Sequence, residues 1–248
     1  MIQILLSGAG GKMGQVISRS VSEREDCRIA AGIDRQSAAV DYPIFEKPSD
    51  CDVCCDVIID FSHPSLLEPL LDYAVSHKIP AVVCTTGLSP EQVDKLKEAA
   101  DKIPVFFSAN MSLGVSLLCE LAKKAAKVLG SDFDIEIIEK HHNRKLDAPS
   151  GTALMLADAI SEELAQPPPY VYDRHSRRAA RSKGEIGIHS VRGGTIVGEH
   201  EILFAGHDET LSLTHTAMSK EIFATGAINA AIFLAKQQPG LYNMGDLV

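Results

Sequence analysis

The stretch QILLSGAGGKMGQVISRSVSE, residues 3–23, decides the fold of the first half of the chain. Residues 3–7 form an apolar run typical of a buried strand, and residues 15–23 carry apolar side chains at helical spacing. Between them, the glycines of GAGGKMG let the backbone turn tightly and approach a pyrophosphate at the start of the helix. The spacing of Gly8, Gly11 and Gly14 also fits a tight turn without a ligand. We interpret the stretch as the opening βαβ unit of a dinucleotide-binding domain.

An acidic residue in the right place supports this interpretation. Asp34 follows Gly14 by 20 residues, at the end of a second predicted strand, residues 28–34. A carboxylate there can accept hydrogen bonds from the ribose hydroxyls of NAD. The next residue, Arg35, can instead pair with the 2′-phosphate of NADP. We therefore expect the chain to use NADH or NADPH.

Strands and helices continue to alternate as far as residue 110. Strands are predicted at 56–62, 81–84 and 104–110, and helices at 66–76 and 89–100. The second of these helices opens with Ser-Pro, a pair typical of the N-cap and N1 positions. The alternation predicts a parallel sheet with helices on both faces.

The pattern changes after residue 110. Helices are predicted at 116–129 and 152–164, and strands at 134–140, 185–192, 195–204 and 210–216, with RGG as a turn between the second and third of these strands. A last helix, residues 221–236, carries small residues that permit close packing against the first domain. The predicted fold is α/β. A Rossmann-type domain comprises residues 1–112 and 221–248, and an α+β domain for substrate binding comprises residues 113–220.

Composition restricts the class of protein. The 248 residues are 45% hydrophobic and 23% charged, which is ordinary for a soluble globular protein, and no apolar run is long enough to cross a bilayer. The N-terminus lacks a basic signal-peptide region, so we expect a cytoplasmic protein without a membrane partner. The net charge of -9 argues against a nucleic-acid partner, because surfaces that bind duplexes are usually basic.

The stretch EIIEKHHNRKLDAPSGTA, residues 136–153, concentrates groups that can carry chemistry. His141, His142 and Lys145 follow a predicted strand, where side chains can converge on a pocket. Imidazole can donate or accept a proton near neutral pH, and a lysine beside a carboxylate ligand stays cationic and can donate one. A single histidine is more often structural, but the tandem pair beside a lysine favours a catalytic site.

The turn that follows suits an anion. Ser150 is a plausible N-cap, which would leave the N–H groups of Gly151 and Thr152 beside the positive end of a helix dipole. A capped helix without a ligand is the alternative. Taken with the preceding cations, the turn predicts a small acid as substrate, in particular a dicarboxylate, reduced by hydride from the cofactor of the first domain.

Two other site types fit less well. Adjacent histidines on an extended segment project in opposite directions, and neither this stretch nor the cysteines of CDVCC, residues 51–55, has the spacing of a zinc site, so we expect no metal. The surroundings of Ser150 lack the GxSxG pattern of a serine hydrolase. We interpret the six cysteines as reduced, structural thiols.

The chain resembles the 4-hydroxy-tetrahydrodipicolinate reductase family, also called dihydrodipicolinate reductase, over essentially its whole length. The resemblance is carried in order by GAGGKMG (8–14), the TTG of CTTG (84–87), SANMSLGV (108–115), EIIEKHHNRKLDAPSGTAL (136–154), SVRGGTIVGEHEILFAG (190–206) and FATGAINAAIFLA (223–235). It implies an NADH- or NADPH-dependent homotetramer of lysine synthesis through diaminopimelate, with the mixed sheet of the second domain used in tetramerisation.

The resemblance also implies roles for individual residues. His141 and Lys145 would be the proton donors, while His142, Gly151 and Thr152 would hold the substrate carboxylates. Cofactor contacts would fall on Gly8, Ala9, Gly10, Gly11, Lys12, Met13, Asp34, Arg35, Cys84, Thr85, Thr86, Ser108, Ala109, Asn110 and Met111. The reaction would deliver a hydride to ring C4 with loss of the hydroxyl as water.

This sequence departs from the family pattern in three places, and other functions stay open. The chain is somewhat compact between the second and third predicted strands, which shortens a surface loop. Cys84 stands where family members usually have glycine, and HSRRAARSK, residues 175–183, replaces a glycine-rich turn. Another amino-acid-pathway dehydrogenase is one alternative, although an aldehyde-type enzyme would need a catalytic cysteine in the second domain, where Cys119 lies in mid-helix. A protein that senses NAD(P) without turnover is the other, but it would not need the His-His-Lys cluster.

Overall fold

The computed structural model describes residues 1–35, 39–108, 110–176 and 178–247. The chain divides into two compact units, Met1–Leu113 with Lys220–Val248 and Gly114–Ser219. The expected boundaries were 112/113 and 220/221. We call these parts the first and the second unit; their roles in cofactor and substrate binding are predictions.

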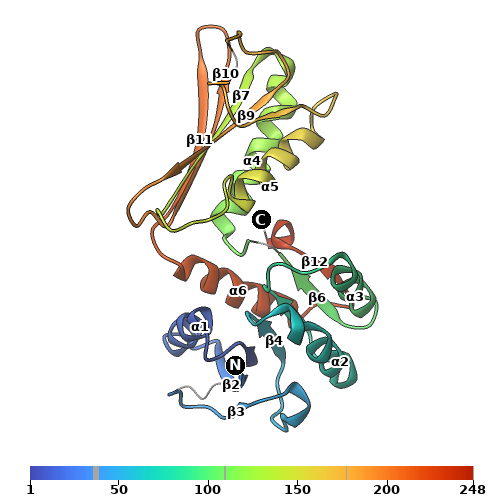
Figure 1. The fold of residues 1–248 in the computed structure, drawn as a ribbon. Helices are drawn as coiled ribbons and strands as arrows, with labels where there is room; N and C mark the ends of the chain where they lie inside the picture. The colour runs from blue at the N-terminus through green and yellow to red at the C-terminus, as the bar shows by residue number, and fades with distance from the viewer. Residues whose placement is uncertain (36–38, 109, 177, 248) are drawn as a thin grey trace. The chain divides into compact units, whose positions relative to one another are not determined.

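The first unit contains a seven-stranded sheet in which every neighbouring pair is parallel (Figure 1). The order β12-β6-β5-β4-β1-β2-β3 places β1 at the point where the direction of winding reverses. The strands are β1 (Ile2–Ser7), β2 (Cys27–Ile33), β3 (Ile44–Phe45), β4 (Val57–Asp60), β5 (Ala81–Val83), β6 (Pro104–Phe107) and β12 (Gly240–Tyr242). The predicted Rossmann-type sheet is therefore confirmed.

Helices cover both faces of this sheet. Its helices are α1 (Lys12–Ser22), α2 (Leu67–His77), α3 (Pro90–Ala100) and α6 (Glu221–Leu234), with short 3₁₀ turns at Pro48–Asp50, Pro64–Leu66 and Met244–Leu247. Ile4 and Leu6 pack in one apolar core with α1 and α6, while Leu5 packs in the other with α2 and α3. Because successive side chains of a strand point to opposite faces, a strand covered on both sides must be apolar throughout. This is why Ile4, Leu5 and Leu6 follow one another without a polar residue between them.

The second unit contains a mixed five-stranded sheet of order β11-β10-β7-β9-β8. Its strands are β7 (Asp134–His141), β8 (Tyr170–Val171), β9 (Ile186–Arg192), β10 (Gly198–Ala205) and β11 (Thr210–Ala217). β9 runs parallel to β7 and to β8, whereas β10 is antiparallel to β7 and to β11. The predicted α+β unit with a mixed sheet is confirmed. The chain does turn at Gly193 and Gly194, but β9 and β10 are not neighbours, because β7 lies between them.

Two helices pack on one face of this mixed sheet, α4 (Leu113–Leu129) and α5 (Gly151–Glu162), and Gly130–Asp132 forms a 3₁₀ turn after α4 (Figure 1). Ile135 and Ile137 of β7 belong to the core beneath these helices. Glu139 and His141 continue the same alternation and therefore lie on the helix-covered side. Glu136, Ile138 and Lys140, by contrast, belong to the other side, which we call the open face.

Arginines anchor the loop that departs from the family pattern. Arg174 contacts Glu136 and Glu185, each at 2.6 Å, and Arg181 contacts Asp134 at 2.8 Å and Glu136 at 3.0 Å. These ion pairs tie the described part of residues 172–185 to β7. Within the described residues, no helix combines the length and apolar character needed to cross a bilayer.

Candidate active site

The glycine loop follows β1 and is shaped by close backbone contacts. Gly8 has φ +80°, in the left-handed region that favours glycine, and a Cβ there would lie 2.6 Å from the carbonyl oxygen of Phe61. A Cβ on Gly14 would lie 2.2 Å from the carbonyl oxygen of Gly8, so helix α1 can start this close to the loop only with glycine. The loop therefore needs these glycines for its own packing.

The start of α1, rather than the loop before it, can offer backbone N–H groups to an anion, because the N–H groups of Gly8, Ala9 and Gly11 already donate to backbone carbonyl oxygens. Helix α1 has Gly11 as its N-cap and no side-chain cap, so no side-chain oxygen of the cap occupies the start of the helix. The Gly10 N–H donates to Asp34 Oδ2 at 2.8 Å, which links the loop to the end of β2. A helix start without a side-chain cap beside a glycine turn fits a pyrophosphate.

A cavity of about 520 Å³ adjoins this loop. Its lining includes Gly8, Gly11, Asp34 and Arg35 from the predicted cofactor set. Residues that the sequence analysis did not single out complete it: Ile33, Glu46, Phe61, Ser62, His63, Ser65 and Leu66. Asp34 and Arg35 thus line one cavity together, as binding of an adenosine ribose would require.

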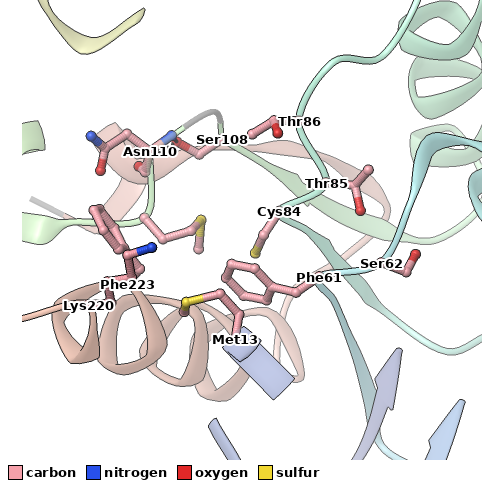
Figure 2. Close-up of a pocket in the computed structure, with 11 residues that line it drawn as sticks. Met13, Phe61, Ser62, Cys84, Thr85, Thr86, Ser108, Asn110, Lys220 and Phe223 are labelled. Carbon is pink, nitrogen blue, oxygen red and sulfur yellow. Dashed lines mark hydrogen bonds between the residues drawn. The ribbon is translucent and has the colours of Figure 1, made fainter. Parts of the chain in front are cut away.

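A second cavity, of about 330 Å³, shares Phe61 and Ser62 with the first. It is lined by Met13, Phe61, Ser62, Cys84, Thr85, Thr86, Ser108, Asn110, Met111, Lys220 and Phe223. Figure 2 shows Met13, Phe61 and the sulfur of Cys84 grouped together, with Thr86, Ser108 and Asn110 along another side. One side is therefore apolar and the other can form hydrogen bonds. Such a cavity can accept a flat ring with a polar substituent.

Cys84 contributes its side chain to this second cavity as well as its backbone. The side chain is buried, and burial raises the pKa of the thiol well above its ordinary value. The Cys84 N–H donates to the carbonyl oxygen of Asp60 at 2.9 Å. A thiol in this state acts as a small apolar group rather than as a nucleophile.

A buried carboxylate holds two of the loops around this cavity. Asp60, at the end of β4, accepts the hydroxyl hydrogens of Ser62 and Thr85, each at 2.6 Å, and the Ser62 N–H at 3.2 Å. A buried carboxylate needs such donors, because leaving it unsatisfied would cost several kcal/mol. Asp60 therefore fixes the positions of both lining segments.

The remaining predicted cofactor residues lie outside both linings or outside the description. Ala9 is fully buried, Gly10 is half-buried, and Lys12 is exposed at the first turn of α1. Ala109 falls outside the described residues. The missed Phe61 and Ser62 directly follow β4, and ligands of open parallel sheets bind at the carboxyl ends of strands. That rule could have identified them, whereas Lys220 and Phe223 carried no such signal.

In the second unit, His141 ends β7 within a buried polar cluster. Its Nδ1 lies 2.6 Å from Glu139 Oε2, and Arg192 at the end of β9 makes two contacts with the Glu139 carboxylate, at 2.7 and 2.8 Å. Burial by itself raises the pKa of Glu139, but hydrogen bonds from Arg192 and His141 outweigh it and lower the pKa to about 2. Glu139 is therefore ionised and paired.

The predicted N-cap of the following helix is confirmed. The Ser150 hydroxyl accepts the Ala153 N–H at 3.2 Å and lies 3.0 Å from His200 Nε2, while the Ser150 N–H donates to Glu139 Oε1 at 3.1 Å. Gly151 is exposed, and no other atom lies within 4 Å of the position that a Cβ would take. Thr152, the second residue of α5, is half-buried. The start of α5 is therefore open at Gly151 and connected to His141 through Glu139.

The other two predicted residues differ in their surroundings. Lys145 Nζ forms an ion pair with Asp147 Oδ2 at 2.9 Å, which lowers the pKa of Asp147. His142 is half-buried, and its Nδ1 is buried with no hydrogen-bond partner among the described residues. Arg192 Nη2 donates to the carbonyl oxygen of Asp147 at 2.6 Å, so His141, Lys145 and the start of α5 belong to one connected cluster, next to His142 with its unpaired Nδ1. Within the described residues, no group of three His, Cys, Asp or Glu side chains could hold a metal ion.

Two family models together match nearly the whole chain. The model described as dihydrodipicolinate reductase, N-terminus, matches residues 2–111, and the one described as dihydrodipicolinate reductase, C-terminus, matches residues 114–248. The two matches meet within a residue or two of the boundary between Leu113 and Gly114.

Full-length relatives agree with these models. A protein of Caldanaerobacter subterraneus subsp. tengcongensis named 4-hydroxy-tetrahydrodipicolinate reductase is 49% identical over 248 residues, covering 100% of this chain and 98% of the relative. One of the same name from Clostridium novyi is 48% identical over 249 residues, with the same coverage. A solved structure of a dipicolinate-bound dihydrodipicolinate reductase from Paenisporosarcina sp. TG-14 has a TM-score of 0.84 at 26% identity and covers 100% of both chains. With both units matched in sequence and fold, this chain belongs to the dihydrodipicolinate reductase family.

Proposed function

We propose that this chain reduces 4-hydroxy-tetrahydrodipicolinate to tetrahydrodipicolinate with loss of water, using NADH or NADPH, in lysine synthesis through diaminopimelate. The observation that carries the proposal is the connected cluster of the second unit, in which His141, Lys145 and the start of α5 combine proton donors with an anion site. Relatives at 49% and 48% identity over the whole chain carry the name of this reductase.

The first unit would hold the cofactor, which supplies a hydride when bound. The glycine loop would let the pyrophosphate approach the N–H groups at the start of α1, and Asp34 would bind the adenosine ribose. Phe61 and Met13 would contact the nicotinamide ring, and Asn110 its carboxamide. Because Asp34 and Arg35 line the same cavity, we propose that both NADH and NADPH are used.

The second unit would bind the substrate through its two carboxylates. The N–H groups of Gly151 and Thr152 would hold one of them at the positive end of α5, and His142 would contribute a hydrogen bond. Lys145 would supply positive charge. Dipicolinate, which is bound in the solved relative, is a dicarboxylate and supports this choice of ligand.

One proton must accompany the hydroxyl group as it leaves as water. His141 Nδ1 is engaged by Glu139, so Nε2 is the ring nitrogen that can deliver a proton. Lys145 Nζ is the second candidate donor. We propose these two atoms as the source of the proton.

Assembly and location extend the proposal. We propose a homotetramer formed through the open face of the mixed sheet, which carries Ile138 and Leu203 opposite the face covered by α4 and α5. The same face carries the ion pairs of Glu136 and Lys140, so apolar and paired charged side chains would both take part in the contact. We further propose that the enzyme works in the cytoplasm, as the family resemblance implies.

The experiment that tests the function is the loss of reduced-nicotinamide absorbance when the protein meets freshly generated 4-hydroxy-tetrahydrodipicolinate, with NADH and NADPH in parallel. Rapid loss is expected. In His141→Ala and Lys145→Ala, turnover should fall by about 100-fold or more, because general acid catalysis contributes on that scale. Cofactor affinity should stay unchanged in both.

Lys140→Ala is the matched control, because Lys140 lies on the same strand but pairs with Glu199 on the open face. It should keep its turnover. If the wild-type protein binds NADH or NADPH but consumes neither, the reductase is the wrong assignment, and a sensing protein or another small-acid dehydrogenase takes its place.

A further inference from the structure

Glu139 is the most completely satisfied charged group of the second unit's cluster. Its side chain is fully buried, and its two oxygens receive hydrogen bonds from three partners. Arg192 donates two of these bonds, the Ser150 N–H donates the third, and His141 Nδ1 lies at 2.6 Å as the fourth contact. A buried carboxylate with this many donors is held rigidly in place.

The Glu139–Arg192 ion pair also contacts the loop that carries Lys145. Arg192 Nη2 donates to the carbonyl oxygen of Asp147 at 2.6 Å, and the carboxylate of Asp147 pairs with Lys145 Nζ at 2.9 Å. The Glu139–Arg192 pair therefore contacts His141 directly, the start of α5 through Ser150, and the loop that carries Lys145 through Asp147. All three parts of the proposed substrate site converge on one ion pair.

Stability alone is a weak reason for such a pair. Burying two charges costs several kcal/mol of solvation, which their mutual attraction often only offsets, and apolar residues of the same volume can be as stable. A Glu-Arg pair is better suited to directional control, because the guanidinium and the carboxylate match in a fixed planar geometry. In this protein the same carboxylate also contacts the imidazole ring of His141.

The orientation of the imidazole has a chemical consequence. An ionised carboxylate at Nδ1 accepts a hydrogen bond, so it favours the form of His141 with the hydrogen on Nδ1. Nε2 is then the atom that takes up a second proton, and the doubly protonated ring can deliver that proton to the leaving hydroxyl group. Gly198 lies beside this nitrogen: a Cβ there would lie 3.1 Å from Nε2, so glycine at this position leaves room for the ring.

We propose that Glu139, held by Arg192, is a positioning residue of this active site: it fixes His141 with Nδ1 protonated and holds the start of α5 in register with it. This inference rests on the proposed function for its kinetic consequence, but the form of the His141 ring can be measured without any reaction.

The test compares Glu139→Gln with the wild type. Glutamine has nearly the same shape but places an NH₂ group where one carboxylate oxygen faces a donor. We expect kcat to fall by about 100-fold, the lower end of what a well-placed general acid contributes, with a smaller change in KM and no change in cofactor affinity. We also expect ¹⁵N NMR of the His141 ring to change from the Nδ1-protonated pattern to a mixture of the two neutral forms.

Glu136→Gln is the matched control. Glu136 lies on the same strand and also pairs with arginines and a histidine, Arg174, Arg181 and His189, but on the open face. It should leave both kcat and the His141 spectrum unchanged. Should Glu139→Gln fail to fold, Arg192→Lys replaces it, because lysine keeps the charge but cannot make the two-bond contact.

The outcomes separate the two proposals. An unchanged Nδ1-protonated spectrum in Glu139→Gln, or a kcat within about threefold of the wild type, overturns the positioning role. A wild-type protein that shows no turnover overturns the proposed reductase function, and the NMR comparison alone then decides the role of Glu139. The positioning role is supported if Glu139→Gln shows both neutral forms of the His141 ring and a large loss of kcat, and Glu136→Gln shows neither change.

Discussion

At the scale of single residues, His200 makes the second unit sensitive to acid. Burial, and then the neighbouring His141, lower its pKa from the ordinary 6.5 to about 4. In the folded chain His200 therefore stays neutral above about pH 4, whereas in the unfolded chain it gains a proton below about pH 6.5. The unfolded state binds more protons in this window, so the free energy of unfolding falls as the pH falls through it. We expect a loss of about 2 kcal/mol between about pH 7 and about pH 5.

Urea denaturation at a series of pH values measures this loss. His200→Gln, which can keep a hydrogen bond to Ser150, should flatten the dependence, although His215 will retain part of it because burial also lowers its pKa. Glu139, whose pKa is lowered to about 2, contributes stability that is lost only at more acid pH, below its ordinary 4.5. An equally steep loss in His200→Gln would assign the acid sensitivity to other groups.

Residues that act together could be predicted only where they are close in the sequence. His141, Lys145 and Ser150 stand in one short stretch, and their types and order were enough to predict a site. Arg192 lies 53 residues beyond its partner Glu139, and His200 lies 50 beyond Ser150. Nothing in the sequence indicates those partnerships, because they depend on which strands become neighbours.

At the scale of elements, helix α3 shows how local chemistry fixes a boundary. The Ser89 hydroxyl accepts the Gln92 N–H at 3.3 Å, the Gln92 side chain accepts the Ser89 N–H at 3.1 Å, and Pro90 occupies the first turn. This capping box satisfies donors that the helix itself leaves unpaired. Ser89→Ala should therefore lower the free energy of unfolding by about 1 kcal/mol.

Urea denaturation at neutral pH measures the effect of Ser89→Ala. Ser22→Ala is the matched control, since Ser22 lies in the last turn of α1 and its hydroxyl donates to the carbonyl oxygen of Arg19 in the same turn. The control should change the free energy of unfolding by less than about 0.5 kcal/mol. Equal effects in the two variants would show that the cap contributes nothing specific.

Most elements could be predicted because their patterns are local, and the exceptions have physical reasons. The missed strands β3, β8 and β12 have two or three residues, which is too short to show a period of two. The turn at Gly193 and Gly194 was expected, but the insertion of β7 between β9 and β10 was not. Strand order depends on which distant segments pair with one another, and the composition of a single segment does not indicate its partner.

At the scale of the whole molecule, the chain leaves the first unit and returns to it. Helix α6 packs with α1 in one core, and Gly226 lets α6 also approach the segment after β6, because a Cβ there would lie 1.7 Å from the carbonyl oxygen of Met111. Small residues in the sequence predicted the close packing. The association of several chains depends on their exposed surfaces, and local sequence patterns predict helices and strands better than they predict such surfaces.

The proposed homotetramer makes the open face of the second unit the decisive surface. We expect sedimentation of the wild type to give four copies of the 26.7 kDa chain. Ile138→Lys should reduce this to smaller species, because a charge buried in an apolar contact is costly, while Glu201 on the paired strand can accommodate the lysine within one chain. Val128→Lys, at a residue 76% exposed on α4, is the matched control and should leave the assembly intact. A tetramer that survives Ile138→Lys would mean that the subunits associate through another surface.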